Sequence, residues 1–181
     1  MATPPTFSTG AVLTAAQMNA VGMWKIGTTT IGTGVSSVNI SNVFTSDYSR
    51  YKIVIQGVVF SASAANAYLQ LFFNGTNYYS AVNYQIATSY AVGTTGLAAA
   101  GVWMVGITGN IFCQYEIDLT TPLGTNWKLG QSTFTAGDNA TSYGGSTRLW
   151  NTNSTTSTGF SFYPSSGTMT GGTITVYGIR S

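Results

Sequence analysis

Histidine is absent from this sequence, and charged side chains are scarce: six Lys and Arg against four Asp and Glu, a net charge of +2 in 181 residues. Without histidine the chain lacks the commonest general base and the commonest metal ligand of proteins. Six basic residues in a chain of this length form no basic stripe of the kind that binds phosphate backbones. We therefore expect no enzymatic activity, no metal or other cofactor, and no nucleic-acid partner.

Cysteine and long apolar runs are equally scarce. Cys113 is the only cysteine, so no disulfide can form within the chain. No stretch approaches the roughly 18 apolar residues that a membrane helix needs, and no secretory leader is visible. We therefore expect no membrane partner, and folding in a reducing cytoplasm. The low charge also leaves little repulsion between copies, which favours dense packing in an assembly.

Glycine, hydroxyl residues and aromatics take the place of charge. The aromatic fraction of 13% argues against disorder, because disordered chains are poor in aromatics and rich in charge. Alternation of apolar and polar residues predicts about ten short strands separated by turns, with no helical repeat. We expect an all-β fold, a jelly-roll-like antiparallel β-sandwich over residues 25–181. The predicted strands cover residues 35–40, 50–59, 67–73, 77–87, 102–108, 111–120, 126–135, 141–150, 159–163 and 172–180.

Three connecting segments are predicted from turn chemistry or from a lack of pattern. The pair Asn74-Gly75 predicts a tight hairpin between strands 67–73 and 77–87, because both central residues of such a turn need positive φ. Residues 88–101 are rich in Ala, Gly and Thr without alternation, which predicts a long loop. Residues 24–26 are expected to lead into a Gly/Thr-rich turn.

Residues 1–24 differ from the β-rich body that follows. Pro4-Pro5 favours an extended start, because each ring fixes φ and disfavours helix at the residue before it. Thr14 and Gln17 have the spacing of a capping box, and the alanines around them favour a short helix. We therefore predict an extended N-terminal arm with a short helix, followed by the sandwich domain over 25–181. A helix this short is marginal alone and needs a surface to lie on.

The two ends of the sequence resemble structural proteins of tailed bacteriophages. Residues 4–19 (PPTFSTGAVLTAAQMN) look like an N-terminal tag of those proteins, in which Phe, a spacer and Gly precede Leu-Thr-Ala and Asn. Residues 171–179 (GGTITVYGI) are similar to the last strand of a β-sandwich module common in the same proteins. Residues 47–51 (DYSRY) also fit that module, at the start of the first long strand.

The resemblance implies an arm that docks on the phage particle and a sandwich displayed outward, commonly as a trimer. Such proteins occur in tail fibres and on head surfaces. Fibres usually have a long shaft between tag and tip, and this chain has none, so we expect a capsid decoration or cement protein. It would belong to the virion, assembled in the host bacterial cytoplasm, with the major capsid protein as its first partner. The expected docking residues of the arm are Phe7, Val12, Leu13 and Met18.

Two carboxylates and one thiol are the candidates for a catalytic function, the alternative to a structural role. Glu116 and Asp118 lie two positions apart on a predicted strand and share one face at about 7 Å, which overlaps the carboxylate spacing of inverting glycosidases. The opposite face of that strand is apolar, so we interpret the pair as a solvated strand face. Cys113 falls on the apolar face, which predicts a buried core residue and not a nucleophile.

Aromatic residues support a second alternative, a tail-fibre or receptor-binding tip that recognises host glycans. Aromatic rings on strands are more often part of a core or an interface than of a sugar-stacking platform. The candidates for such a platform are Trp24, Trp103, Trp127, Trp150, Tyr78, Tyr79 and Tyr84.

Overall fold

The computed structural model describes residues 10, 22–72, 77–120, 122–125 and 127–180, and these residues form thirteen β-strands and no helix. All ladders between the strands are antiparallel. The all-β prediction is therefore confirmed. The strands are β1 (Met23–Thr30), β2 (Val38–Ile40), β3 (Arg50–Phe60), β4 (Asn66–Leu71), β5 (Tyr78–Ile86), β6 (Val92–Ala100), β7 (Trp103–Ile107), β8 (Phe112–Thr120), β9 (Lys128–Gly137), β10 (Ser142–Asn151), β11 (Phe160–Pro164), β12 (Met169–Thr170) and β13 (Thr173–Ile179).

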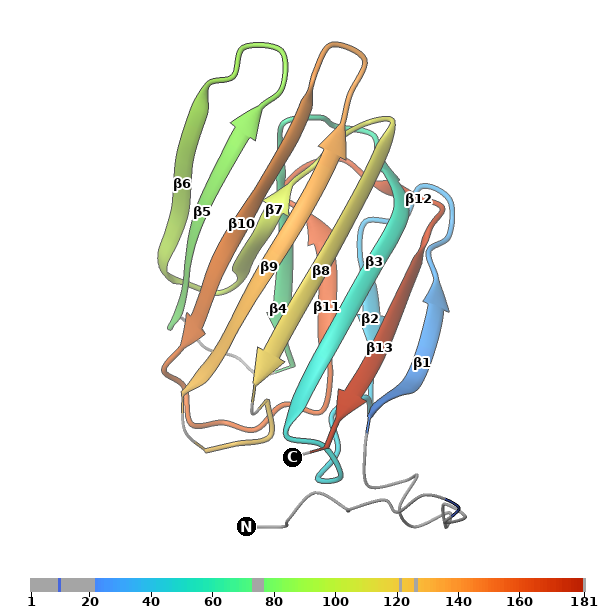
Figure 1. Cartoon of the computed structure of the whole chain (residues 1–181), viewed down its shortest axis with the longest axis vertical. Helices are drawn as coiled ribbons and strands as arrows, with labels where there is room; N and C mark the ends of the chain where they lie inside the picture. The colour runs from blue at the N-terminus through green and yellow to red at the C-terminus, as the bar shows by residue number, and fades with distance from the viewer. Residues whose placement is uncertain (1–9, 11–21, 73–76, 121, 126, 181) are drawn as a thin grey trace.

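The strands build two sheets that lie one behind the other (Figure 1). The large sheet has the order β1-β13-β3-β8-β9-β10-β5-β6, with the short β12 beside β3. The small sheet has the order β2-β11-β4-β7 and lies behind the large sheet in Figure 1. Within the described residues, no helix is long and apolar enough to cross a membrane.

The core lies between the sheets, because alternate residues of each strand point to the same face. In β3, Tyr51, Ile53 and Ile55 are buried while Lys52 and Val54 between them are partly exposed. The inward side chains of the small sheet pack against those of the large sheet, and together they form one apolar core. The largest apolar side chains of this core are Trp103, Tyr51, Tyr78, Tyr115, Phe60, Phe160, Phe162, Ile53, Ile55, Leu69 and Leu71.

Three sequence predictions of local structure are wrong. The segment 88–101, predicted as a long loop, contains the nine-residue strand β6. The predicted strands 67–73 and 77–87 do not pair as a hairpin, because β4 lies in the small sheet and β5 in the large one, and the Asn74-Gly75 turn itself lies outside the described residues. Residues 27–30, expected in a turn, continue β1. In the first and third cases pairing with a neighbouring strand stabilises a segment whose own residues favour no regular structure.

The predictions for the N-terminal arm fall on residues that the structure does not describe. β1 begins at Met23, so Met23 and Trp24, assigned to the arm from the sequence, form part of the large sheet. The extended start and the short helix lie outside the described residues, as do the expected docking residues Phe7, Val12, Leu13 and Met18.

Candidate functional site

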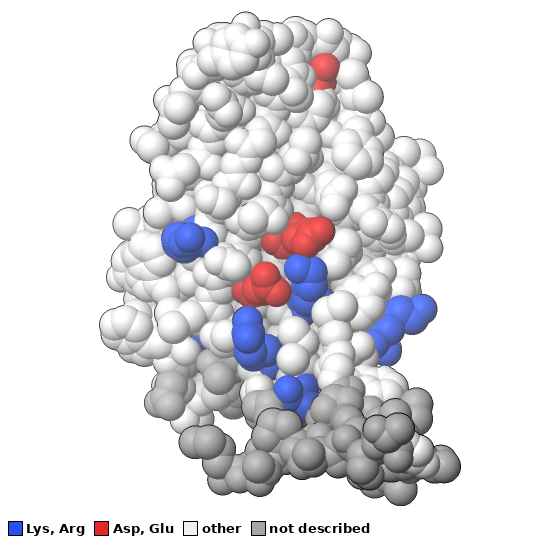
Figure 2. Space-filling model, viewed as in Figure 1, with Lys and Arg blue, Asp and Glu red and all other residues white. Residues whose placement is uncertain are grey.

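The outer face of the large sheet carries most of the charge of the molecule. Residues paired across neighbouring strands point to the same face, so outward side chains line up in rows. One row contains, in order, Lys25, Tyr177, Lys52, Asp118, Gln131 and Arg148. Arg50 lies in a second row, nearer the end of the sheet where Met23 pairs with Ile179. Figure 2 shows the charged residues of this face gathered mainly in its lower half.

Lys52 binds both carboxylates that the sequence singled out. Its Nζ lies 2.8 Å from a carboxylate oxygen of Glu116 and 4.0 Å from one of Asp118. The hydrogen bond with Glu116 raises the pKa of Lys52, burial opposes that shift, and the charge of Asp118 adds to it. Glu116 and Asp118 therefore share one lysine on a partly exposed strand face, which is a small surface ion-pair cluster.

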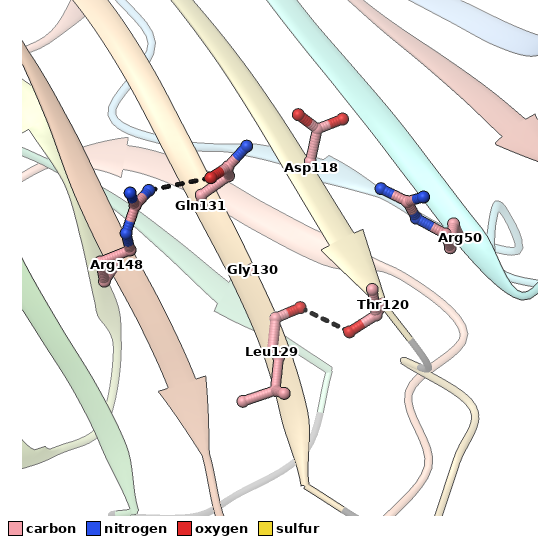
Figure 3. Close-up of a pocket in the computed structure, with 7 residues that line it drawn as sticks. All are labelled: Arg50, Asp118, Thr120, Leu129, Gly130, Gln131 and Arg148. Carbon is pink, nitrogen blue, oxygen red and sulfur yellow. Dashed lines mark hydrogen bonds between the residues drawn. The ribbon is translucent and has the colours of Figure 1, made fainter.

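A shallow depression lies beside this cluster, between Arg50 and Arg148 (Figure 3). It has a volume of about 290 Å³. Arg148 donates a hydrogen bond of 2.8 Å to the side-chain oxygen of Gln131, which orients both groups. Figure 3 shows the two guanidinium groups on opposite sides, with Asp118 and Gln131 between them. The depression thus offers cationic donors and a carboxylate acceptor to a small polar ligand. Its lining residues are Arg50, Asp118, Thr120, Leu129, Gly130, Gln131 and Arg148.

An aromatic surface continues from this depression across β10 and β5. The rings of Tyr79 and Trp150 stack with their centroids 5.4 Å apart and their planes at 2°. Leu129, half exposed, pairs with Trp150 in the ladder and also lines the depression. A stacked, partly exposed pair of aromatic rings therefore lies next to hydrogen-bonding groups on this face.

Four of the other aromatic candidates do not join this surface, whereas Trp127, which directly precedes β9, is exposed. Trp103 and Tyr78 are fully buried and pack edge to face in the core. Tyr84 points to the inner side of the sheet, where its ring lies beside Tyr143. Trp24 lies on β1, at the opposite edge of the large sheet. The aromatic candidates therefore do not form one platform: they are divided among the core, the inner and outer faces of the large sheet, and its β1 edge.

Cys113 is a core residue, as the alternation predicted. Its side chain is fully buried, and its Sγ accepts a hydrogen bond of 3.0 Å from the backbone N–H of Gly109. Burial raises the pKa of the Cys113 thiol to about 11, so the nucleophilic thiolate is disfavoured at neutral pH.

Lys128 is a buried lysine that the sequence analysis did not single out. Its Nζ donates hydrogen bonds to the backbone oxygens of Gly124 at 3.0 Å and Asn153 at 2.8 Å. Burial lowers the pKa of Lys128. The alternation of β9 places Lys128 in phase with the buried Ser132 and Phe134, and this signal could have revealed it. Lys128 joins the segment before β9 to the loop after β10.

The described residues contain no group of three or more His, Cys, Asp or Glu that could hold a metal ion. Comparisons of the chain with protein-family models, with curated proteins and with solved structures give no match.

Proposed function

We propose that eight of the strands form a jelly roll, which is one long hairpin folded so that its strand pairs alternate between two sheets. The order of the strands supports this assignment. The first and last strands of the set, β1 and β13, pair, as do β3 and β8 in the same sheet. In the other sheet β2 pairs with β11 and β4 with β7. Contacts of β13 with β3 and of β11 with β4 join the pairs within each sheet.

Two additional hairpins widen only one side of this jelly roll. The β5–β6 pair follows β4 in the chain, and the β9–β10 pair follows β8. Both pairs add to the large sheet beyond β8, in the order β9-β10-β5-β6. The large sheet thereby gains the broad outer face that carries the depression and the Tyr79–Trp150 stack.

On this fold we assign the chain the role of a non-enzymatic structural protein of a tailed-bacteriophage virion, a decoration or cement protein of the capsid. The observation that carries the proposal is the combination of a jelly-roll strand order with the phage-like N-terminal tag at residues 4–19. Jelly rolls are common among capsid proteins, although they also occur elsewhere, so the fold supports the role by analogy. The expected partners are the major capsid protein and further copies of this chain.

The arm is expected to dock the protein from one end of the sandwich. β1 begins beside the end of β13, where Met23 pairs with Ile179 (Figure 1). Arg50 pairs with Ile179 as well, so the arm joins the domain at the end that carries this arginine. Apolar contacts of Phe7 and Leu13 with capsid subunits would supply most of the attachment, and repetition over many copies would strengthen it.

Truncation of the arm tests the proposal. We expect the chain without residues 1–22 to unfold like the full chain and to lose binding to phage heads that lack this protein, as measured by co-sedimentation. The double variant Phe7→Ala/Leu13→Ala should bind weakly, whereas Tyr90→Ala, at the exposed tip between β5 and β6, should bind normally. Decoration by the truncated chain at the level of the full chain would show the proposed docking role to be wrong.

A second candidate function is glycan recognition by a tail-fibre or receptor-binding module. The Tyr79–Trp150 stack beside the Arg148–Gln131 pair favours it, because partly exposed aromatic rings and an oriented donor meet there. The test is a glycan array with the purified full chain. Trp150→Ala should abolish any reproducible binding, while Trp24→Ala on β1 should leave it unchanged. An array without binding, or binding that survives Trp150→Ala, would exclude this surface as a glycan site.

A further inference from the structure

The large sheet ends at β6, and in the described part of the chain β6 pairs on one side only, with β5. Residues 92–97 of β6 contain two glycines and two threonines and no charge or proline. Their pairing with β5 is regular, and the single irregularity lies further along, opposite Tyr78 and Ser80. Such an edge presents a row of backbone N–H and C=O groups to which another strand can add.

The other three edges of the two described sheets are protected. β1, at the opposite edge of the large sheet, carries the exposed Lys25 and a bulge between Lys25 and Gly27. In the small sheet β2 is only three residues long, and β7 is buried at all five positions. Edge lysines, bulges, short strands and coverage are the devices by which proteins prevent edge pairing. Residues 92–97 have none of them.

The surroundings of β6 are suited to a second copy of the same surface. Residues 53–115 contain no Asp, Glu, Lys or Arg, so β4 to β7 are uncharged. Figure 2 accordingly shows no charged residue over β5 and β6. Two such surfaces can approach without placing like charges together.

The inner side of the sheet next to β6 is apolar and incompletely covered. The small sheet ends at β7, whereas the large sheet continues through β5 and β6. Tyr84, Ile86 and Leu97 on this inner side are therefore only partly buried. The Tyr84 ring already covers the backbone at Gly93. A strand added at β6 would extend the sheet and remove more of this apolar surface from water.

We propose that β6 pairs antiparallel with β6 of a second copy of this chain, which joins the two large sheets across a twofold axis. A copy can offer only this edge, because its other edges are protected, and antiparallel pairing of a strand with itself is self-complementary. Since side chains alternate, an axis at Thr94 or Thr95 keeps the two inner faces on one side. The inference does not depend on the proposed function. A twofold dimer and the trimer that the phage resemblance implies are distinguished by mass.

The mass of the full chain, measured by sedimentation equilibrium, gives the first test, and a dimer is expected. Thr95→Lys places like charges close together at the axis and should raise the dissociation constant by about tenfold or more. The matched control is Thr30→Lys at the β1 edge, which should leave the dimer intact. A mixture of Thr95→Lys and Thr95→Glu should restore a dimer that contains one of each.

A monomeric or trimeric full chain would overturn the proposal, as would a dimer insensitive to Thr95→Lys. If Thr95→Lys does not fold, as judged by circular dichroism, cysteine crosslinking decides. In a Cys113→Ala background, Thr94→Cys or Thr95→Cys should form an interchain disulfide under mild oxidation, because the residue on the axis faces its own copy. Thr30→Cys in the same background should not. Absence of a crosslink from both β6 variants would also contradict the proposal.

Discussion

Tyr51 joins the first long strand to the loop before it through a single hydroxyl group. The hydroxyl donates to the backbone oxygen of Thr45 at 2.7 Å and accepts from the backbone N–H of the same residue at 2.8 Å. The ring also packs edge to face on Phe44, at 4.7 Å between centroids. One side chain thus provides hydrogen-bond partners for the N–H and the oxygen of Thr45, a loop residue that is not paired in either sheet.

Tyr51→Phe should lower the free energy of unfolding by about 1–3 kcal/mol, because the Thr45 N–H loses its partner and the Thr45 oxygen keeps only the long bond of 3.4 Å from the Tyr48 N–H, while the ring packing stays. Urea denaturation measures the change. The matched control is Tyr163→Phe, whose hydroxyl makes one long bond of 3.4 Å to Gln70, and whose effect should stay within about 0.5 kcal/mol. Equal effects of the two variants would refute the role given to Tyr51.

Cys113 should make the protein less stable at alkaline pH. Burial raises the pKa of its thiol from the ordinary value of 9.0 to about 11. Between these values the unfolded chain has released the proton and the folded chain still holds it, so the free energy of unfolding falls as pH rises. The full loss is about 3 kcal/mol. Cys113→Ala should show a shallower fall between about pH 9 and 11 in urea titrations, and an unchanged slope would contradict the assignment.

Single residues show where sequence reasoning succeeds and fails. The alternation of apolar and polar residues placed Cys113 in the core and Glu116 with Asp118 on one outer face, and the structure agrees. It did not reveal that Lys52 lies between the carboxylates, because cross-strand neighbours depend on strand order. The burial of Lys128 was not predicted, because lysine is seldom buried. Its acceptors are backbone oxygens, which cannot be identified from a pattern of side chains.

At the scale of elements, strands with strong alternation were predicted to within a few residues. Predicted strand 50–59 corresponds to β3 and 111–120 to β8, because half-buried strands display a period of two. β6 was missed because Ala, Gly and Thr show no such period when both faces are thinly covered. The Asn74-Gly75 signal misled for another reason: local turn chemistry does not determine which sheet the next strand joins.

Two adjacent glycines before β13 should differ in their tolerance of substitution. Both have positive φ, +67° at Gly171 and +85° at Gly172. A Cβ on Gly171 would meet nothing within 4 Å, whereas one on Gly172 would lie 2.6 Å from the backbone oxygen of Gln56. The second contact falls on the irregularity between Gln56 and Val58, where Gly57 also has positive φ. Gly172 therefore allows β13 to approach this bulge of β3 closely.

Gly171→Ala should cost about 1–2 kcal/mol of unfolding free energy, because only the backbone conformation is strained. Gly172→Ala should cost more by at least about 1 kcal/mol, since backbone atoms of β3 must move as well. Thermal and urea unfolding of the two variants give the comparison directly. Similar values would mean that the backbone of β3 at Gln56 moves aside without a loss of stability, which would contradict the close packing of Gly172 against it.

At the scale of the whole molecule, strand pairing joins distant parts of the chain. The β1–β13 ladder brings Met23 opposite Ile179, and the β2–β11 ladder brings Ile40 opposite Phe160. Strand order of this kind could not be predicted from the sequence, because every half-buried strand has a similar pattern and many pairings satisfy it. The predicted class of fold followed from composition and period, whereas the two-sheet order required the structure.

The same long-range pairing predicts slow folding. Loops spanning most of the chain must close before the outer ladders gain stability, so we expect refolding from urea on the order of seconds. Stopped-flow fluorescence can follow the burial of Trp103, which is fully enclosed in the folded state. The chain without residues 1–22 should refold at the same rate, because its strands are unchanged. Complete refolding within a millisecond would be incompatible with this topology.

The antiparallel pairing of β1 with β13 also determines how the domain bears mechanical load. Met23 and Ile179 are opposite each other at one end of a ladder that runs to Thr30 and Thr173. Force applied between these two residues acts across the ladder, so hydrogen bonds open one pair at a time, as in a zipper. Force applied between Met23 and Thr173, which lie on different strands at opposite ends of the ladder, shears all of its hydrogen bonds at once and meets greater resistance. A domain held at residue 22 therefore resists a pull applied near Thr173 more strongly than a pull applied after Ile179.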